Sequence, residues 1–436
     1  MKVLKFGGKS LSGGEGSPLN QSLDIICQEA RKGKVYVVCS ARGKSTDMLE
    51  DMLLKAAAGE DYMPAFDYFF ERQQAPSKSV DMKAEHAEMK QILAGVALLG
   101  EYSQKVKDRF LSFGEILSCK MVAHLLRKRG FKARFVDSRT LIKTTEEYGP
   151  ASVLLDVSER NVKEFFKDAP EDQIEVVTGF IGTTLTNQTT TLGRNGSNYS
   201  ATLLASFLGA EEVQNWTNVD GVYTANPSMV EDAQIIPLLS YREANELANF
   251  GTNVLHAKTI LPLIEKKIPI RILNSFHPDC QGTTIAEQGA GDGLKAISVI
   301  DDVALVSIDN GQKLRDTYGQ PVMDQLHCFV GNQWKKHYDT PLHQVVCRLT
   351  GSIFVVGSVD TTGPQLAARM QELYEQMPHE CITTTGMMHR VQFTMSGAAA
   401  GLDEVEAKNW PALYELCDAR LRKVQASGGD RIGCAE

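Results

Sequence analysis

The feature that most constrains the fold is a strand–loop–helix pattern in the middle of the chain. A short β-type run, Thr189–Leu192, leads into a loop with Gly193 and Gly196, and a helix-like run over residues 201–208 follows. Glycines let a backbone turn sharply and approach a ligand closely, and a helix N-terminus with free N–H groups attracts anions. Arg194 adds a guanidinium that can hold a carboxylate or phosphate through two hydrogen bonds. The pattern predicts an anion-binding turn; an ordinary βα loop with a surface arginine is the alternative.

The same pattern occurs twice earlier in the chain. Val3–Phe6 predicts a strand before the glycine-containing turn 7–10, and Val35–Cys39 predicts a buried strand before the small-residue loop 40–43. Strands that end in such loops and are followed by helices favour an α/β sheet whose sites lie at the carboxyl ends of the strands. In the strand–loop–helix pattern described first, three residues have side chains that suit a helix N-cap: Ser197, Asn198 and Ser200.

Lys5 stands directly before the first glycine turn, where its ammonium could reach a bound phosphate. A solvent-exposed lysine at the end of a strand is the alternative. Neither glycine turn is a Walker A loop, because Val3 and Val38 occupy the positions where that motif requires another glycine. A P-loop ATPase is therefore not expected.

Composition excludes several other classes of protein. The chain has 436 residues, enough for about two to three domains, and is 43% hydrophobic and 23% charged. Its net charge of −8 argues against general binding to nucleic acid or anionic membranes. Its nine cysteines are scattered without a C-x-x-C pair, which fits reduced thiols. No apolar run approaches the ~20 residues of a membrane span, and we expect no signal peptide and a cytoplasmic location.

Three further segments are informative: a helical region, a long loop and a glycine-rich linker. Residues 46–111 are mostly helical in pattern and predict an excursion from the sheet, after which Ser112–Glu115 is expected to open a new helix with Glu115 in its first turn. The loop over residues 217–227 suits a nucleotide-base pocket, with a plain surface loop as the alternative. The glycine-rich segment Gln288–Gly293 predicts a linker between domains at residues 1–288 and 295–436.

Five short motifs occur in a specific order along the chain. They are Lys5–Gly8, Ser112–Glu115, Thr191–Ser197, Trp216–Thr224 and Phe250–His256. In order and spacing they resemble the aspartate kinases, most closely the aspartokinase part of the bifunctional aspartokinase–homoserine dehydrogenases, over roughly residues 1–286. Because the sequence ends at Glu436, no homoserine dehydrogenase domain is expected.

The resemblance implies an amino-acid-kinase fold, a mainly parallel sheet sandwiched by helices. It also implies transfer of the γ-phosphoryl group of ATP, with Mg²⁺, to the side-chain carboxylate of L-aspartate, the first step of lysine, threonine and methionine biosynthesis. The implied contacts to the acceptor and the reacting phosphoryl group come from Lys5, Ser40, Thr46, Glu115, Arg194, Ser197 and Asn198. Glu115 would pair with the substrate ammonium and Arg194 with its α-carboxylate. The implied ATP contacts come from Lys5, Gly7, Gly8, Thr217, Asn218, Tyr223, Ser228, Asn253 and Val254.

Some positions depart from the usual family pattern. The departures are Lys9, Asn198, Asn218, Asn226, Ser228, Asn253 and Ala257. The family usually has aspartate at 198, 218 and 226, arginine at 228 and lysine at 253, so carboxylates and cations are missing around the nucleotide and the reacting centre. These replacements predict a slow enzyme.

The second half, residues 295–436, alternates strand and helix patterns. In the family this region is a pair of ACT domains, βαββαβ modules that bind effector amino acids and dimerise. We therefore expect α+β ACT-like domains here and a homodimer or larger oligomer formed through them. The usual effector signature is absent, which predicts weak inhibition by lysine or threonine. His327, His337 and His343 lack an ordered ligand spacing, so no metal site is expected.

These patterns predict an aspartokinase that binds L-aspartate and ATP. The alternative is a catalytically weak or inactive paralogue that binds an amino acid or nucleotide and acts as a regulatory protein. A third possibility is an amino-acid kinase for another acidic substrate. A nucleoside monophosphate is disfavoured as acceptor, because Glu115 and Arg194 suit the two charges of an α-amino acid.

Overall fold

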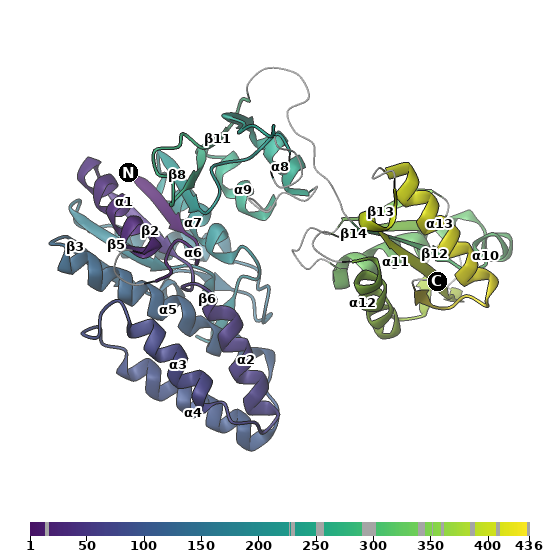
Figure 1. The fold of residues 1–436 in the computed structure, drawn as a ribbon, viewed down its shortest axis with the longest axis horizontal. Helices are drawn as coiled ribbons and strands as arrows, with labels where there is room; N and C mark the ends of the chain where they lie inside the picture. Colours follow the sequence, from purple (N-terminus) through teal and green to yellow (C-terminus); the bar gives the residue numbers. More distant parts are fainter. Residues whose placement is uncertain are drawn as a thin grey trace. The chain divides into compact units, whose positions relative to one another are not determined.

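A computed structural model describes residues 1–13, 17–225, 227, 232–249, 257–289, 302–338, 345–350, 352–358, 362–383, 389–406 and 410–433. The chain divides into two compact units, Met1–Asn245 with Val254–Ala296, and Glu246–Asn253 with Ile297–Glu436. Figure 1 traces both units, and each is described by itself. In the described part of the chain, no helix combines the length and the apolar character that crossing a membrane requires.

The first unit is built on an eight-stranded sheet with the order β3-β5-β2-β1-β8-β10-β11-β9. Only the β10–β11 pair is antiparallel, and the other neighbours are parallel. The strands are β1 (Lys2–Phe6), β2 (Val35–Cys39), β3 (Lys132–Val136), β5 (Gln173–Thr178), β8 (Glu212–Thr217), β9 (Leu238–Ser240), β10 (Ile270–Asn274) and β11 (Thr283–Ala286). This mainly parallel sheet confirms the expected α/β class.

Helices cover both faces of this sheet. On one face, α1 (Pro18–Lys32) and α5 (Gln104–Lys128) share a buried core with β1, β2 and β5. On the other face, α7 (Gly196–Leu208) packs against β1 and β8, and α6 (Leu155–Phe166) and α9 (Ala257–Ile264) pack against α7. The first part of the helix α8 (Tyr241–Asn249), as far as Asn245, and a small sheet of β4 (Lys143–Thr144), β6 (Ile181–Thr184) and β7 (Thr189–Thr191) complete the unit.

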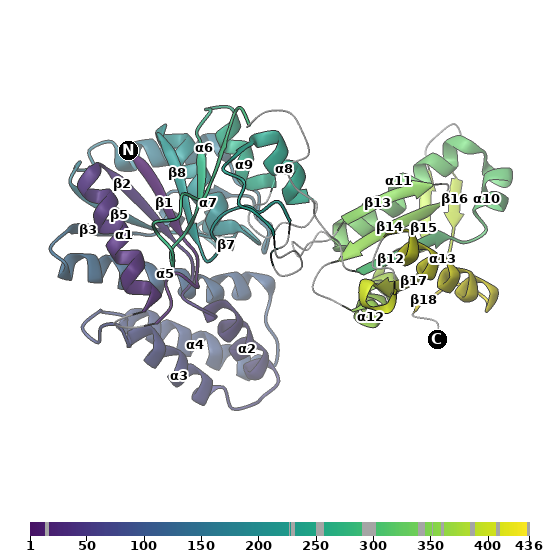
Figure 2. The same cartoon turned by 45° about the horizontal axis from the view of Figure 1, so that its top comes forward.

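The helical excursion is present but ends earlier than expected. It consists of α2 (Ser45–Ala57), α3 (Met63–Gln74) and α4 (Lys83–Leu99), which lie together apart from the sheet in both views (Figures 1 and 2). The next helix, α5, begins at Gln104, where the Ser103 side chain accepts a hydrogen bond from Val106 N. The expectation that Ser112–Glu115 opens a helix is therefore wrong. Glu115 lies in the middle of a 25-residue helix, so no N-terminal helix dipole acts on it.

The second unit has one five-stranded sheet with the order β13-β14-β12-β17-β18. Its elements in chain order are β12 (Asp302–Ile308), α10 (Gly311–Tyr318), α11 (Gln320–Tyr338), β13 (Val345–Thr350), β14 (Ile353–Ser358), α12 (Gly363–Gln376), β15 (Glu380–Thr383), β16 (His389–Gln392), β17 (Met395–Gly401), α13 (Trp410–Ala426) and β18 (Ile432–Gly433). The strands β12, β13, β14 and β17, with helices α11 and α12, make a single βαββαβ arrangement. The described residues thus contain one βαββαβ module, extended by α13 and β18.

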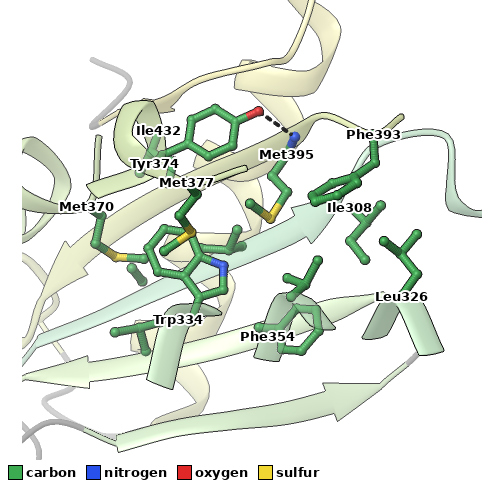
Figure 3. Close-up of a cluster of buried hydrophobic side chains, with 14 of the residues drawn as sticks. Ile308, Leu326, Trp334, Phe354, Met370, Tyr374, Met377, Phe393, Met395 and Ile432 are labelled. Carbon is green, nitrogen blue, oxygen red and sulfur yellow. Dashed lines mark hydrogen bonds between the residues drawn. The ribbon is translucent and has the colours of Figure 1, made fainter. Parts of the chain in front are cut away.

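Buried side chains fill both faces of this second sheet. Trp334 of α11 is fully buried among Met370, Met377 and other apolar residues (Figure 3). In the same core, the hydroxyl of Tyr374 accepts a hydrogen bond from Met395 N (2.9 Å) and donates one to Asp430 (2.6 Å). The opposite face packs a smaller cluster under α13. The unit therefore has a core of its own.

We expect Trp334→Ala to lower the free energy of unfolding of the second unit by about 3–5 kcal/mol, because it leaves a cavity in a closed core. Chemical denaturation followed by circular dichroism measures this. Gln376→Ala is the control: Gln376 is an exposed residue of α12 in the same unit, so its truncation should change stability by no more than about 0.5 kcal/mol. Equal effects of the two substitutions would contradict the assignment of Trp334 to the core.

Candidate active site

Lys5 lies near the carboxyl end of the central strand β1. Phe6 pairs with Cys39 of β2 and with Trp216 of β8, so the three strands end at the same level. Leu4 and Phe6 belong to the core under α1 and α5, and because side chains alternate along a strand, Lys5 faces the α7 side. Its side chain is buried, and no hydrogen-bond or ion-pair partner for its ammonium lies in the described part of the chain. Burial lowers the pKa of Lys5 to about 8.

The glycine turn after β1 lies against the loop after β2. Gly43 N donates to Gly8 O (2.8 Å), and a Cβ atom on Gly8 would lie 2.5 Å from Ala41 O, so only glycine fits there. A Cβ atom on Gly7 would lie 3.6 Å from the Lys5 Nζ, which places this backbone beside the ammonium. The structure thus places the backbone of Gly7 beside the Lys5 ammonium.

Arg42 fixes the loop after β2, a role that its sequence context did not indicate. Its buried guanidinium donates to the carbonyl oxygens of Leu11 (2.9 Å), Gly13 (2.8 Å) and Gln73 (3.1 Å). Burial lowers the pKa of Arg42 to about 10. Ser40 and Thr46 flank this loop: Ser40 follows β2 directly, Thr46 lies in the first turn of α2, and both are half-buried.

Glu115 is buried where α5 meets the same loop. Its Oε1 accepts a hydrogen bond from Ala41 N (3.1 Å), whereas its Oε2 is buried and has no partner in the described structure. A Cβ atom on Gly114 would lie 2.8 Å from the Ala41 Cβ, so glycine at this position allows the close approach of α5. Burial raises the pKa of Glu115 to about 8, although the hydrogen bond from Ala41 opposes the shift.

The loop that leads into α7 brings Arg194, Ser197 and Asn198 to the unit. Asn195, with a φ of 54°, is the N-cap of α7 and makes no side-chain cap bond, so the expectation that Ser197, Asn198 or Ser200 caps the helix is wrong. Ser200 instead donates to Gly196 O and accepts from Phe180 N, because the preceding strand loop packs on this turn of the helix.

These side chains differ in burial. Arg194 is exposed, and Ser197 is buried against Gly179, where a Cβ atom would lie 2.7 Å from the Ser197 Oγ. Asn198 is buried, its Nδ2 donates to Asn195 Oδ1 (3.4 Å), and its Oδ1 has no partner in the described structure. A buried oxygen without a partner is uncommon in a folded protein and marks a place where a ligand can donate a hydrogen bond.

Two further polar residues at this edge were not identified from the sequence. Asn215 of β8 pairs in register with Lys5, and its buried Oδ1 has no partner among the described residues. Asp220, in the loop after β8, accepts hydrogen bonds from Asn274 (2.6 Å) and from Tyr223 (3.4 Å), and its carboxylate lies 2.9 Å from His277 Nδ1. Burial opposes ionisation of Asp220, but the Asn274 and His277 contacts outweigh it and lower its pKa.

The remaining expected nucleotide contacts are only partly described. Thr217 ends β8 and donates to Asn218 (3.5 Å), which is exposed. Ser228, Asn253 and Val254 lie outside the described residues, as does Asn226. Within the described ranges, no group of three or more histidine, cysteine, aspartate or glutamate side chains could hold a metal ion.

The raised pKa of Glu115 predicts how stability changes with pH. Between its ordinary value of 4.5 and about 8, the folded protein keeps a proton that the unfolded chain releases, so the free energy of unfolding contributed by Glu115 falls as pH rises. Because glutamine does not titrate, Glu115→Gln removes this pH-dependent fall in the free energy of unfolding. We expect the ligand-free variant to melt at least about 2 °C above the parent at pH 8 and equally with it near pH 4.5.

Melting temperatures of both proteins across this pH range measure the effect. Glu101→Gln is the control, because Glu101 is exposed and its substitution should leave the two melting curves superimposed at every pH. A parent protein that gains stability relative to Glu115→Gln as pH rises would contradict the assignment.

Comparison with known proteins places this chain in a family. The model of the amino acid kinase family matches residues 1–274. The bifunctional aspartokinase/homoserine dehydrogenase 1, chloroplastic, of Zea mays is 32% identical over 327 residues, which are 70% of this chain and 35% of that protein. Aspartokinase 3, chloroplastic, of Arabidopsis thaliana is 35% identical over 295 residues, 65% of this chain and 52% of that protein. The chain therefore spans about a third of the length of its bifunctional relatives.

Solved structures show the same fold. Escherichia coli aspartokinase III in complex with aspartate and ADP superimposes with a TM-score of 0.66 at 24% identity, over 92% of this chain and 86% of that one. The aspartate kinase of Clostridium acetobutylicum gives a TM-score of 0.63 at 21% identity, over 97% and 91% of the two chains.

A second family model, described as the diguanylate cyclase GGDEF domain, matches residues 301–431, the region where ACT-like domains were expected. The residues that GGDEF abbreviates do not occur together in this sequence, and the one Gly-Gly-Asp tract, at 428–430, continues with Arg431. The match to the amino acid kinase model covers more than half of the chain. The chain accordingly belongs to the amino acid kinase family, and within that family it resembles the aspartokinases.

Proposed function

We propose that the protein is an aspartokinase, which transfers the γ-phosphoryl group of ATP to the side-chain carboxylate of L-aspartate and forms 4-phospho-L-aspartate. The observation that carries this proposal is Glu115, a buried carboxylate with one oxygen held by Ala41 N and the other without a partner among the described residues. Such an oxygen suits the ammonium of an α-amino acid, because burying that cation beside it satisfies both groups.

In this proposal, three charged side chains each bind a different part of the two substrates. Glu115 binds the ammonium of aspartate and is ionised by it, Arg194 binds its α-carboxylate, and Lys5 contacts the transferring phosphoryl group. The attacking carboxylate carries no proton, so no general base is needed, and catalysis consists of positioning and charge neutralisation. Because the pKa of Lys5 is about 8, its ammonium remains mostly protonated at neutral pH.

In this proposal the nucleotide binds at the same carboxyl edge of the sheet, beside the loop that follows β8. Thr217 and Tyr223 line its pocket, and Asp220 holds Tyr223 and the β10 end in place. Mg²⁺ often binds through one or two carboxylates, substrate phosphates and water. Asn198 presents a buried amide oxygen that has no partner among the described residues, and this oxygen fits an ion that arrives with ATP. The ion would neutralise phosphate charge.

The relatives support this substrate pair. One matched structure is described as aspartokinase III with aspartate and ADP, and another as the same protein with lysine and aspartate. We therefore also propose lysine or threonine as an effector and a homodimer or larger assembly. A role in lysine, threonine and methionine biosynthesis follows from the same reaction.

An ADP-release assay tests the proposal directly. The full-length protein with ATP and Mg²⁺ is given L-aspartate, L-glutamate or N-acetylglutamate. Release of ADP that depends on aspartate, with trapping of the acyl phosphate by hydroxylamine, is the expected result. Release with another acceptor would identify a different amino-acid kinase. Binding of aspartate without turnover would identify the regulatory paralogue, for which the loss of the family's aspartate at Asn198 is the motivating observation.

Arg194→Ala should raise the KM for aspartate much more than the KM for ATP. Losing a charge-assisted, two-point contact costs about 1.5–3 kcal/mol, or roughly 10- to 150-fold in KM. Initial rates at varied aspartate and saturating ATP measure the effect. Arg160→Ala is the control, because Arg160 is an exposed arginine of α6. An unchanged aspartate KM in Arg194→Ala would remove Arg194 from the acceptor site.

Asn198→Asp should raise kcat at least severalfold with little change in the aspartate KM. A carboxylate on the α7 side would orient the buried Lys5 ammonium, which has no ion-pair partner in the described structure. Two unit charges 4 Å apart interact by roughly 4 kcal/mol at an effective dielectric of 20, and tenfold in rate needs only about 1.4 kcal/mol. Steady-state kinetics of the parent protein and of Asn198→Asp measure both kcat and the aspartate KM. A flat or lower kcat would show that the neutral amide is a working part of this site.

A further inference from the structure

Asp108 is a fully buried carboxylate on α5, about two helical turns before Glu115. Its Oδ2 accepts hydrogen bonds from Gly149 N (2.8 Å) and Thr191 N (2.9 Å), and its Oδ1 accepts one from Gln104 Nε2 (3.1 Å). The Thr191 hydroxyl lies 3.2 Å from Oδ1 and 2.7 Å from Gly149 O, and its single proton serves one of these acceptors. No ion-pair partner of Asp108 lies in the described ranges, so an ionised carboxylate here is stabilised by neutral donors.

These hydrogen bonds join segments that are far apart in the chain. Thr191 ends β7, directly before Leu192 and Gly193, and Thr191 O accepts a hydrogen bond from Ala151 N (2.9 Å). Gly193 has a φ of 73°, and a Cβ atom on it would lie 3.1 Å from the Pro150 Cβ. The loop that carries Arg194 is therefore packed on residues 149–151, and Asp108 ties both to α5.

The same helix carries Glu115. The two groups proposed to hold opposite ends of an amino acid thus stand on elements that Asp108 connects: Glu115 further along α5, and Arg194 just beyond the end of β7. A group that sets the distance between two binding charges affects every substrate that must contact both charges. A misplacement of a binding group by about 1 Å can lower the reaction rate up to about a hundredfold.

We propose that Asp108 is a positioning residue for the acceptor amino acid, which sets the distance between Glu115 and the Arg194 loop. This inference rests on the proposed function of Glu115 and Arg194 as the acceptor clamp. Asp108 touches neither substrate and acts through Thr191 and Gly149.

Kinetics of Asp108→Ala in the full-length protein test the proposal. We expect the KM for aspartate to rise about tenfold or more and the KM for ATP to stay within about twofold. Asp108→Asn is the conservative rescue: its amide oxygen can still accept from Gly149 N and Thr191 N but is neutral, so a smaller rise of about two- to fivefold is expected. If Asp108→Ala does not fold, the same split between the two KM values in Asp108→Asn decides the question.

Glu175→Gln is the matched control for a general loss of stability. Glu175 of β5 is also fully buried, and it is held by Arg134 (2.7 Å) and by Gln173 (2.9 Å). This variant should lower the melting temperature and leave the aspartate KM within about twofold. Equal rises of both KM values in the Asp108 variants, or an aspartate KM that follows melting temperature in all variants, would overturn the proposal.

A crystal structure of Asp108→Asn or Asp108→Ala gives a readout that does not depend on activity. We expect residues 192–197 to move relative to Glu115 while the rest of the sheet superimposes. An unmoved loop would overturn the positioning role even if the enzyme is active. If the parent protein phosphorylates no amino acid, the proposed function fails, and the loop position alone still decides whether Asp108 sets this spacing.

Discussion

Two ionisable side chains, Lys5 and Glu115, lie buried at the carboxyl edge of the sheet without an oppositely charged partner in the described structure. Burial of an unpaired charge is costly, and both groups respond by shifting their pKa toward the neutral form. Such an arrangement persists only where the surrounding backbone determines it. The parallel register holds Lys5, and the contact of Gly114 with Ala41 holds Glu115. A ligand that brings one cation and one anion would relieve both groups.

Other buried polar groups differ from these because their hydrogen bonds are fulfilled. Arg42 donates to three carbonyl oxygens, and Asp108 accepts from backbone N–H groups of two segments. These residues hold loops in place, whereas Glu115, Asn198 and Asn215 each keep a buried oxygen that has no partner among the described residues. A buried oxygen of this kind is available to a ligand that donates a hydrogen bond.

The second unit shows why a regulatory role cannot be carried over from a family's usual domain order. The pattern of strands and helices predicted α+β modules, and a βαββαβ core is present. Its extension by α13 and β18, and the match to the GGDEF model over residues 301–431, distinguish it from a plain βαββαβ module. Function depends on sites placed on a fold, so the shared core says little about an effector.

The sequence by itself determined the α/β class, the strand–loop–helix units and the residues that stand at the strand ends, because these depend on local pattern and on the order of motifs along the chain. It placed Lys5, Gly7 and Gly8 at the end of a strand in this way, whereas Glu115 was expected in the site only from the resemblance to the aspartate kinases. Only the tertiary structure decided that α5 begins at Gln104, that Asn195 caps α7, and that Asn215, Asp220 and Asp108 lie in or beside the site. The physical reason is that strand register and the packing of distant segments choose each side chain's neighbours, and neither is written in local sequence.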